Sequence, residues 1–382
     1  MTLTQHQSAT GSSSAAGTSA AATGSGAALR TLIGMELRQR FRSRGWYIML
    51  AVFFVVVGLV TLASIGLARS MTYDSDLQAS ARIMFDLIVM FVLLLALLVS
   101  PALSANAISG DRANGTLAIL QVTPIRTWHL MLGKWVAGWL SAVAFLIAAL
   151  PWMIVSAVIG QVNPVTFLVM TLLVLVQFAV VTGIGVAISA ITGRTLFAVV
   201  ITYLLVAALS VGSLISFGLG SQFTNTTVQA NSLSYSATST NGDNDWMVDY
   251  GRPTGCTGAL RTQTVADLRR TSWLLAPNPF VVVADGTPRP SGESDLLGFT
   301  PLSAISLGVR YAQLSPQETT ACVNGEFREE AVSMGEANVA DTRPVWPFGL
   351  LLQGLLVAGL AVWGHRRLHT PAGRLSQGTR IA

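Results

Sequence analysis

Few residues of this 382-residue chain have side chains that could do chemistry, because 52% of its residues are hydrophobic and only 11% are charged. Lys134 is the only lysine, and every other member of the Lys+Arg total is an arginine. A P-loop cradles phosphates with a glycine-rich turn that ends in Lys-Ser or Lys-Thr, whereas Lys134 is followed by Trp135. We therefore expect no catalytic residues here, and no ATP hydrolysis by the chain itself.

Metal and proton chemistry is equally sparse in the sequence. The two cysteines and four histidines form no motif with the spacing of metal ligands. Asp86 is a carboxylate within an apolar run, which is typical of an ion pathway, but its place near one end favours a solvated aspartate at a helix start. The sequence thus predicts no metal site and no cofactor bound by this chain.

One polar loop, residues 109–131, carries more structural signals than a chain reversal needs. It begins with an acidic–basic pair and an Asn-Gly turn signal. Thr116 is expected to cap a short helix that ends before Pro124. A short helix along the membrane, preceded by charges, is typical of an element that docks a cytosolic partner. The alternative is a loop that only turns the chain around.

These residues must be positioned by six long apolar runs. A helix needs about 20 apolar residues to cross a hydrocarbon core of about 30 Å, and each run is long enough. Six such runs disfavour the alternative of buried helices in a soluble protein. The composition also excludes a disordered chain, a nucleic-acid-binding protein with a charged surface and an ordinary soluble enzyme. The runs are 46–68, 84–108, 132–159, 165–191, 196–219 and 346–364.

The distribution of charge predicts the orientation of these runs. The side that holds the N-terminus has 13 basic residues in its short segments, against two in the short loops of the opposite side. Short cytoplasmic loops carry the excess of Lys and Arg in membrane proteins. We therefore expect both termini to be cytoplasmic, with residues 365–382 forming a basic cytoplasmic tail and residues 220–345 on the extracytoplasmic side.

The chain before the first run divides into two parts. Residues 1–28 are mostly Ser, Ala, Gly and Thr, so we expect a disordered tail, and they lack the basic start and apolar centre of a signal peptide. Residues 29–45 are expected to form an interfacial amphipathic helix, because their apolar residues tend to one side. Arginines that fall among these apolar residues are tolerated, since their stems can reach the headgroups. The charged residues that we assign to this helix are Glu36, Arg38, Arg40 and Arg42.

The long segment 220–345 is large enough for a small domain, and we expect mixed α+β structure there. Its polar opening, residues 221–245, is typical of a loop. Cys256 and Cys322 both lie in this segment. An extracytoplasmic location favours a disulfide between them, which would stabilise the fold by roughly 4 kcal/mol in the loop-entropy model. The alternative is two separate buried thiols.

The loop after the second run resembles that of the ABC-2-type permeases, the membrane subunits of many bacterial ABC exporters. Those proteins typically show an acidic–basic pair, then GTL with an apolar pair, then TP, and finally GK at the start of the next span. The matching elements here are Asp111-Arg112, Gly115-Thr116-Leu117, Thr123-Pro124 and Gly133-Lys134. The family commonly has Glu at the position of Asp111, and segment 220–345 is longer than its counterpart in better-known members.

The resemblance implies a permease driven by two copies of a separate P-loop ATPase, which bind the ATP and Mg. The residues that would receive the ATPase are Asp111, Arg112, Gly115, Thr116, Leu117, Thr123 and Pro124. It also implies the bacterial plasma membrane and a second six-span half, in a homodimer or a heterodimer. The substrate would be amphiphilic, such as a drug, a lipid or a peptide.

The fold expected from all of this is an all-α polytopic membrane protein with an α+β domain between its fifth and sixth transmembrane helices. Transmembrane helices 1–5 occupy residues 46–219. The extracytoplasmic domain is expected to gate the outer mouth, recognise cargo or bind an envelope partner. A second hypothesis is a non-transporting mechanotransmission or scaffold subunit. In that case a cytosolic ATPase would drive its external domain.

Overall fold

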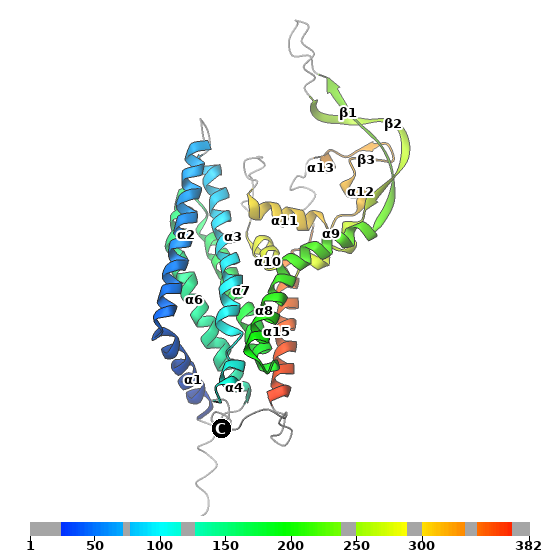
Figure 1. Cartoon of the computed structure of the whole chain (residues 1–382). Helices are drawn as coiled ribbons and strands as arrows, with labels where there is room; N and C mark the ends of the chain where they lie inside the picture. The colour runs from blue at the N-terminus through cyan, green and yellow to red at the C-terminus, as the bar shows by residue number, and fades with distance from the viewer. Residues whose placement is uncertain are drawn as a thin grey trace, which may run out of the picture.

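The computed structural model describes residues 24–71, 77–115, 127–237, 250–288, 300–332 and 342–368. A bundle of long helices carries a smaller, strand-containing part at one end (Figure 1). The helices of the bundle are α1 Gly24–Phe41, α2 Arg44–Met71, α3 Leu77–Ser104, α4 Ser109–Ala113, α6 Thr127–Ile159, α7 Pro164–Ile191, α8 Thr195–Ala207, α9 Ser213–Phe223 and α15 Trp346–Leu368. The end of the bundle near α4 is called the α4 end below, and the opposite end the α11 end.

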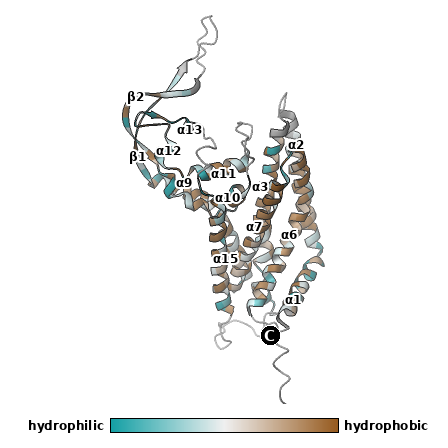
Figure 2. Cartoon of the chain, turned by 180° about the vertical axis from the view of Figure 1, so that it is seen from behind, coloured by the Kyte–Doolittle hydropathy of each residue, from teal (hydrophilic) through white to brown (hydrophobic). Residues whose placement is uncertain are grey.

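Six helical segments in the described part of the chain are long and apolar enough to cross a membrane, which confirms the number predicted from the sequence. Apolar residues dominate these helices, whereas the strands of the attached part are mixed (Figure 2). The segments are Arg44–Gly66, Ala81–Ala113, Thr127–Ile159, Pro164–Ile191, Thr195–Phe223 and Trp346–Leu368. Pro101 and Pro151 lie inside α3 and α6, as expected for membrane helices whose neighbours support the backbone.

Aromatic rings fill the centre of the bundle. The rings of Phe53 on α2 and Phe145 on α6 pack edge to face with their centroids 5.3 Å apart. Phe85 on α3 and Phe178 on α7 belong to the same buried cluster. Four helices therefore share one apolar core, and α15 packs along α7 beside it.

The fifth apolar run is interrupted by a π turn, Ala208–Gly212, between α8 and α9. Asn278 occupies this break, because its Nδ2 donates to the Ser210 carbonyl oxygen at 2.7 Å and to the Ser213 hydroxyl at 2.8 Å. Wide turns of this kind free a backbone carbonyl that a side chain can bind. A residue that comes after the fifth span in the sequence is thus bonded into the break of that span.

Polar cap residues followed by proline start the helices near the α11 end. Asn163 and Pro164 begin α7, and Asn278 and Pro279 begin α10, Pro279–Gly286. Thr300 caps α11, Pro301–Tyr311, in the same way. Proline at the first helical position has no N–H to leave unpaired. The side chain of the cap residue accepts a hydrogen bond from one of the free backbone N–H groups that follow. Buried valines of α10 lie against α7 and α15, so this short helix packs within the bundle.

Beyond α9 the chain forms a sheet in the order β2-β1-β3-β4, in which every pairing is antiparallel. Short helical turns surround it: Leu268–Arg270, Ser272–Leu275, α12 Pro316–Thr319 and α13 Glu329–Val332. The strands are β1 Asn225–Ala237, β2 Tyr250–Ala266, β3 Cys322–Val323 and β4 Glu326–Phe327.

The loop predicted at the start of this segment is wrong for residues 225–237, which form β1. Val228 and Ala230 are buried while Thr227 and Gln229 are exposed, so the strand has the period of two that one buried face requires. The polar composition of β1 conceals this period in the sequence. Pairing with the long strand β2 overrides the loop preference that this composition suggests. The disulfide is confirmed: Cys256 in β2 is bonded to Cys322 in β3, with Cα atoms 5.8 Å apart.

Candidate functional site

At the α4 end, one buried ammonium joins three helices. Lys134 lies near the start of α6, and its side chain is 2% exposed. Its Nζ atom is 2.5 Å from Oε1 of Glu36 on α1 and 2.6 Å from Oδ2 of Asp111 on α4. Glu36, Asp111 and Lys134 are called the Lys134 cluster below. The acidic member of the loop's charged pair and the lysine that opens the next span therefore meet.

Burial makes these contacts necessary to the fold. A buried charge without a partner costs several kcal/mol, so a lysine this deep must be paired. Its two partners are more accessible, since the side chains of Glu36 and Asp111 are 15% and 26% exposed. The cluster therefore keeps its cation inside and presents its carboxylates toward the surface of the α4 end.

Buried apolar residues pack beside the Lys134 cluster. Leu32 on α1, Ile108, Leu130, Met131 and residues of α7 and α15 form one buried group. The side chain of Leu32 lies against Gly133, where any Cβ would collide with it. The Gly-Lys pair thus has a joint role, because the glycine lets α1 approach α6 and the lysine binds the carboxylate that α1 brings.

The loop's charged pair divides its contacts between two spans. Asp111 binds α6 through Lys134, whereas Arg112 donates from Nη1 to the carbonyl oxygen of Thr192, at the end of α7, at 3.1 Å. The hydroxyl of Ser189 on α7 accepts the backbone N–H groups of Ile108 and Ser109, each at 2.9 Å. These bonds satisfy free donors at the start of α4 and seat it on α7.

The remaining predicted residues of this region have different positions. Gly115 has a φ of +75°, which confirms the turn that the Asn-Gly pair predicts and favours glycine there. Thr116, Leu117, Thr123 and Pro124 lie outside the described residues. The short helix expected to run from Thr116 to Gln121 also lies there, as does the predicted disordered tail up to residue 23.

The arginines in α1 and just after it have unequal environments. Arg38 and Arg42 are exposed, while Arg40 is half-buried. Burial lowers the pKa of Arg40, and the nearby Glu36 carboxylate acts in the opposite direction. Glu36 faces inward to Lys134, so α1 turns its acidic residue to the bundle, while Arg38 on α1 and Arg42 just after it are exposed.

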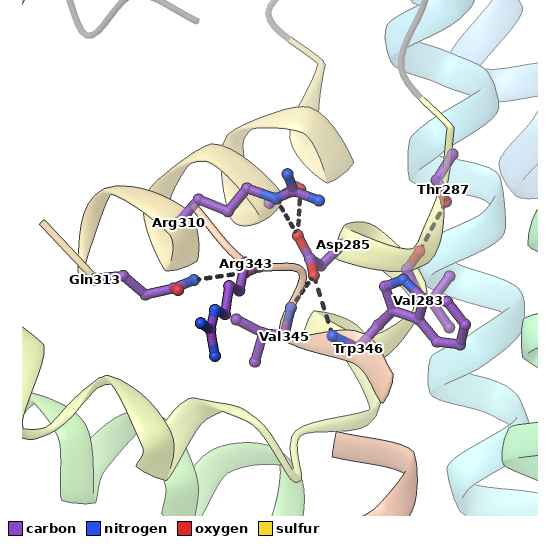
Figure 3. A network of polar contacts seen from close by, with 9 residues as sticks. Val283, Asp285, Thr287, Arg310, Gln313, Arg343, Val345 and Trp346 are labelled. Atoms are coloured by element: carbon purple, nitrogen blue, oxygen red, sulfur yellow. Dashed lines mark hydrogen bonds and ion pairs between the residues drawn. The ribbon is translucent and has the colours of Figure 1, made fainter. Parts of the chain in front are cut away.

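A second polar network lies at the α11 end, around Asp285 at the end of α10 (Figure 3). Its Oδ1 accepts from Arg310 Nε at 2.6 Å and from the Ser306 hydroxyl at 3.1 Å. Its Oδ2 accepts from the backbone N–H groups of Val345 at 2.6 Å and Trp346 at 3.1 Å. One carboxylate therefore fastens α10 to α11 and to the first turn of α15. Sequence reasoning missed this network, because its members are dispersed along the chain.

Asp86 corrects a prediction made from the sequence. It is not a solvated residue at a helix start, since it lies well inside α3 and is only 5% exposed. Its Oδ2 accepts the backbone N–H of Leu302, in the first turn of α11, at 3.2 Å. A helix start with free N–H groups favours a carboxylate, which explains the burial of this charge.

Comparison with known proteins places these features in a family. A search among curated proteins finds no match to this chain. Residues 30–311, most of the chain, match the sequence model of the ABC-2 family transporter proteins. That match covers most of α1 and all of α2 to α11. It contains five of the six candidate spans and both polar networks, apart from Val345 and Trp346. The chain therefore belongs to the ABC-2 family of transporter proteins and is a multi-pass membrane permease component.

Proposed function

We propose that this chain is the membrane permease of an ABC exporter, driven by a separate P-loop ATPase that docks at the α4 end. The family supports the role of membrane subunit and a partnership with an ATPase. The Lys134 cluster is the observation that carries the docking proposal. It joins the basic helix α1, the start of the loop and the start of α6 through one buried ammonium.

The contacts around α4 suggest how a push from the ATPase would reach the spans. Ion pairs hold α1 and α4 to α6, while Ser189 and Thr192 hold α4 to α7. A displacement of the loop therefore moves the ends of two spans together. ATP binding would drive transport if it favoured one of two arrangements of these helices over the other.

The rest of the proposal concerns assembly and orientation. The α4 end and both termini face the cytoplasm of a bacterial cell, and the sheet faces outward. Two ATPase copies bind ATP and Mg, and this chain binds neither. A second six-span half, identical or related, completes the pathway in the bilayer for an amphiphilic drug, lipid or peptide. The excess of basic residues beside the α4 end supports this orientation.

Cysteine cross-linking tests the docking surface. Arg38 and Asn114 are exposed at the α4 end, and Leu260 on β2 is 51% exposed. Arg38→Cys and Asn114→Cys should each form a bismaleimide product with a co-expressed P-loop ATPase, and Leu260→Cys serves as the matched control. The native cysteines are bonded to each other and do not compete. A product from Leu260→Cys alone would contradict docking at the α4 end.

One observation favours the second hypothesis, a mechanotransmission subunit. Three side chains tie the segment that follows the fifth span to the bundle: Asn278 binds that span, Asp285 binds α15, and Asp86 on α3 binds α11. Movement of the spans would therefore reach the outer part. Stimulation of ATP hydrolysis by an amphiphile in the reconstituted complex would favour the exporter. An unstimulated rate, altered by an envelope partner instead, would favour mechanotransmission.

A further inference from the structure

A pocket of about 290 Å³ lies beside the Asp285 network, next to the first turn of α15. Its lining residues are Asp285, Gly286, Thr287, Pro288, Arg310 and Trp346. This volume is below the usual range for drug-sized ligands, so the pocket suits a small group or one end of a larger molecule. Figure 3 shows its polar wall, where the guanidinium of Arg310 reaches over Asp285 from α11.

The hydrogen-bonding capacity of this wall is unbalanced. Both oxygens of Asp285 are occupied, each by two donors. A guanidinium has five N–H donors, and Arg310 uses only Nε on Asp285. Among the described residues, neither terminal nitrogen of Arg310 has a hydrogen-bond partner. The wall therefore offers donors to a ligand while its acceptor is already satisfied.

The accessibility of Arg310 fits a binding role. Its side chain is 19% exposed, whereas that of Asp285 is fully buried. The carboxylate holds the guanidinium by one edge, and the opposite edge remains open to an entering group. Guanidinium edges bind phosphate and carboxylate oxygens with two parallel hydrogen bonds. The ligand expected on chemical grounds is therefore an oxyanion.

We propose that this pocket binds a phosphate group, and that the phosphate belongs to a lipid headgroup. The first turn of a candidate membrane span forms one wall, and headgroups lie at this level of a bilayer. Trp346 lines the pocket, and tryptophan is common at the membrane–water boundary. The site is distinct from the ATPase-docking surface, and its occupation requires neither ATP nor a transported substrate.

Two lipids that differ only in phosphate test the site. Full-length protein is equilibrated in detergent with equimolar dioleoyl phosphatidate and dioleoylglycerol, and the retained lipids are counted by native mass spectrometry. The wild type should retain phosphatidate about tenfold better, since charge-assisted bonds of this type are worth a factor of that order. Inorganic phosphate in a parallel arm separates the sources: if it raises Tm while phosphatidate is not retained, the site binds a free oxyanion.

Three variants assign the binding to this pocket. Asp285→Asn with Arg310→Gln removes the guanidinium without leaving a lone buried charge. Pro288→Trp fills the exposed rim and leaves the ion pair intact, so it decides the matter if the double variant does not fold. Both should remove the preference for phosphatidate. Arg343→Gln, an exposed arginine of the same region that does not line the pocket, should retain it. Equal retention of both lipids by the wild type with no effect of phosphate, or unchanged preference in the pocket variants, overturns the proposal.

Discussion

The Nζ atom of Lys134 lies 2.5 Å from Oε1 of Glu36, although 98 residues separate the two along the chain. This contact fastens α1, which precedes the first span, to the start of the third. Because Asp111 on α4 binds the same ammonium, α1, α4 and α6 are joined at one point. In the function proposed above, the chain's only lysine would therefore connect ATPase docking to movement of the spans.

Removal of the Lys134 ammonium should destabilise the protein strongly. Lys134→Met leaves two carboxylates facing each other at the edge of the bundle, and breaking a buried pair in this way costs about 3–5 kcal/mol. We expect a clear fall in the Tm of the detergent-purified protein. Adding Glu36→Gln and Asp111→Asn to Lys134→Met should recover much of the loss, because no unpaired charge then remains. Arg42→Gln, at an exposed position just after α1, is the control, and a Lys134→Met variant as stable as that control would rule out this account.

The close approach of α1 to α6 depends on Gly133. Gly133→Val would force a side chain against Leu32, and overpacking of this kind costs about 1–3 kcal/mol. Leu32→Ala in the same chain should relieve part of the loss, which a double-mutant cycle of Tm or denaturant midpoints would measure. Gly359→Val on α15 has open space around it and should change little. Additive effects of the Leu32 and Gly133 changes would show that the two residues do not pack together.

The Cys256–Cys322 bond should stabilise the sheet specifically. The bonded residues are 66 apart in sequence, and closing a loop of this length stabilises a fold by roughly 4 kcal/mol in the entropy model. Maleimide should add no mass to the unfolded, unreduced protein and should add two labels after reduction. Replacing both cysteines by serine should speed protease cleavage within β1 and β2 while the bundle stays intact. Labelling without reduction would contradict the bond.

The sequence was informative wherever a property depends on residues close together in the chain. Six apolar runs predicted six candidate spans, and Asn114-Gly115 predicted the turn that the φ of Gly115 confirms. Glycine and lysine at the start of the third run form a motif in the sequence. Their purpose was not evident, because it depends on Leu32 and Glu36 more than 90 residues away.

Tertiary partners decided the features that sequence reasoning missed or misjudged. The sequence predicts Asp86 in water, yet the free N–H groups at the start of α11 make burial favourable for its carboxylate. The polar strand β1 was expected as a loop, because its regularity depends on pairing with β2. In the Asp285 network, Arg310 and Trp346 come from helices far along the chain, and no local pattern indicates that they meet.

ATP-dependent transport by variants of the loop tests the central proposal most directly. The permease and its ATPase are reconstituted in proteoliposomes, and movement of a fluorescent amphiphile is measured together with ATP hydrolysis. Asp111→Arg places a second cation beside Lys134, and Gly115→Pro is incompatible with a φ of +75°. Both variants should insert and support ATP hydrolysis but lose transport. Normal transport by both variants, or no ATP-dependent movement by the wild type with any amphiphile, would contradict the account.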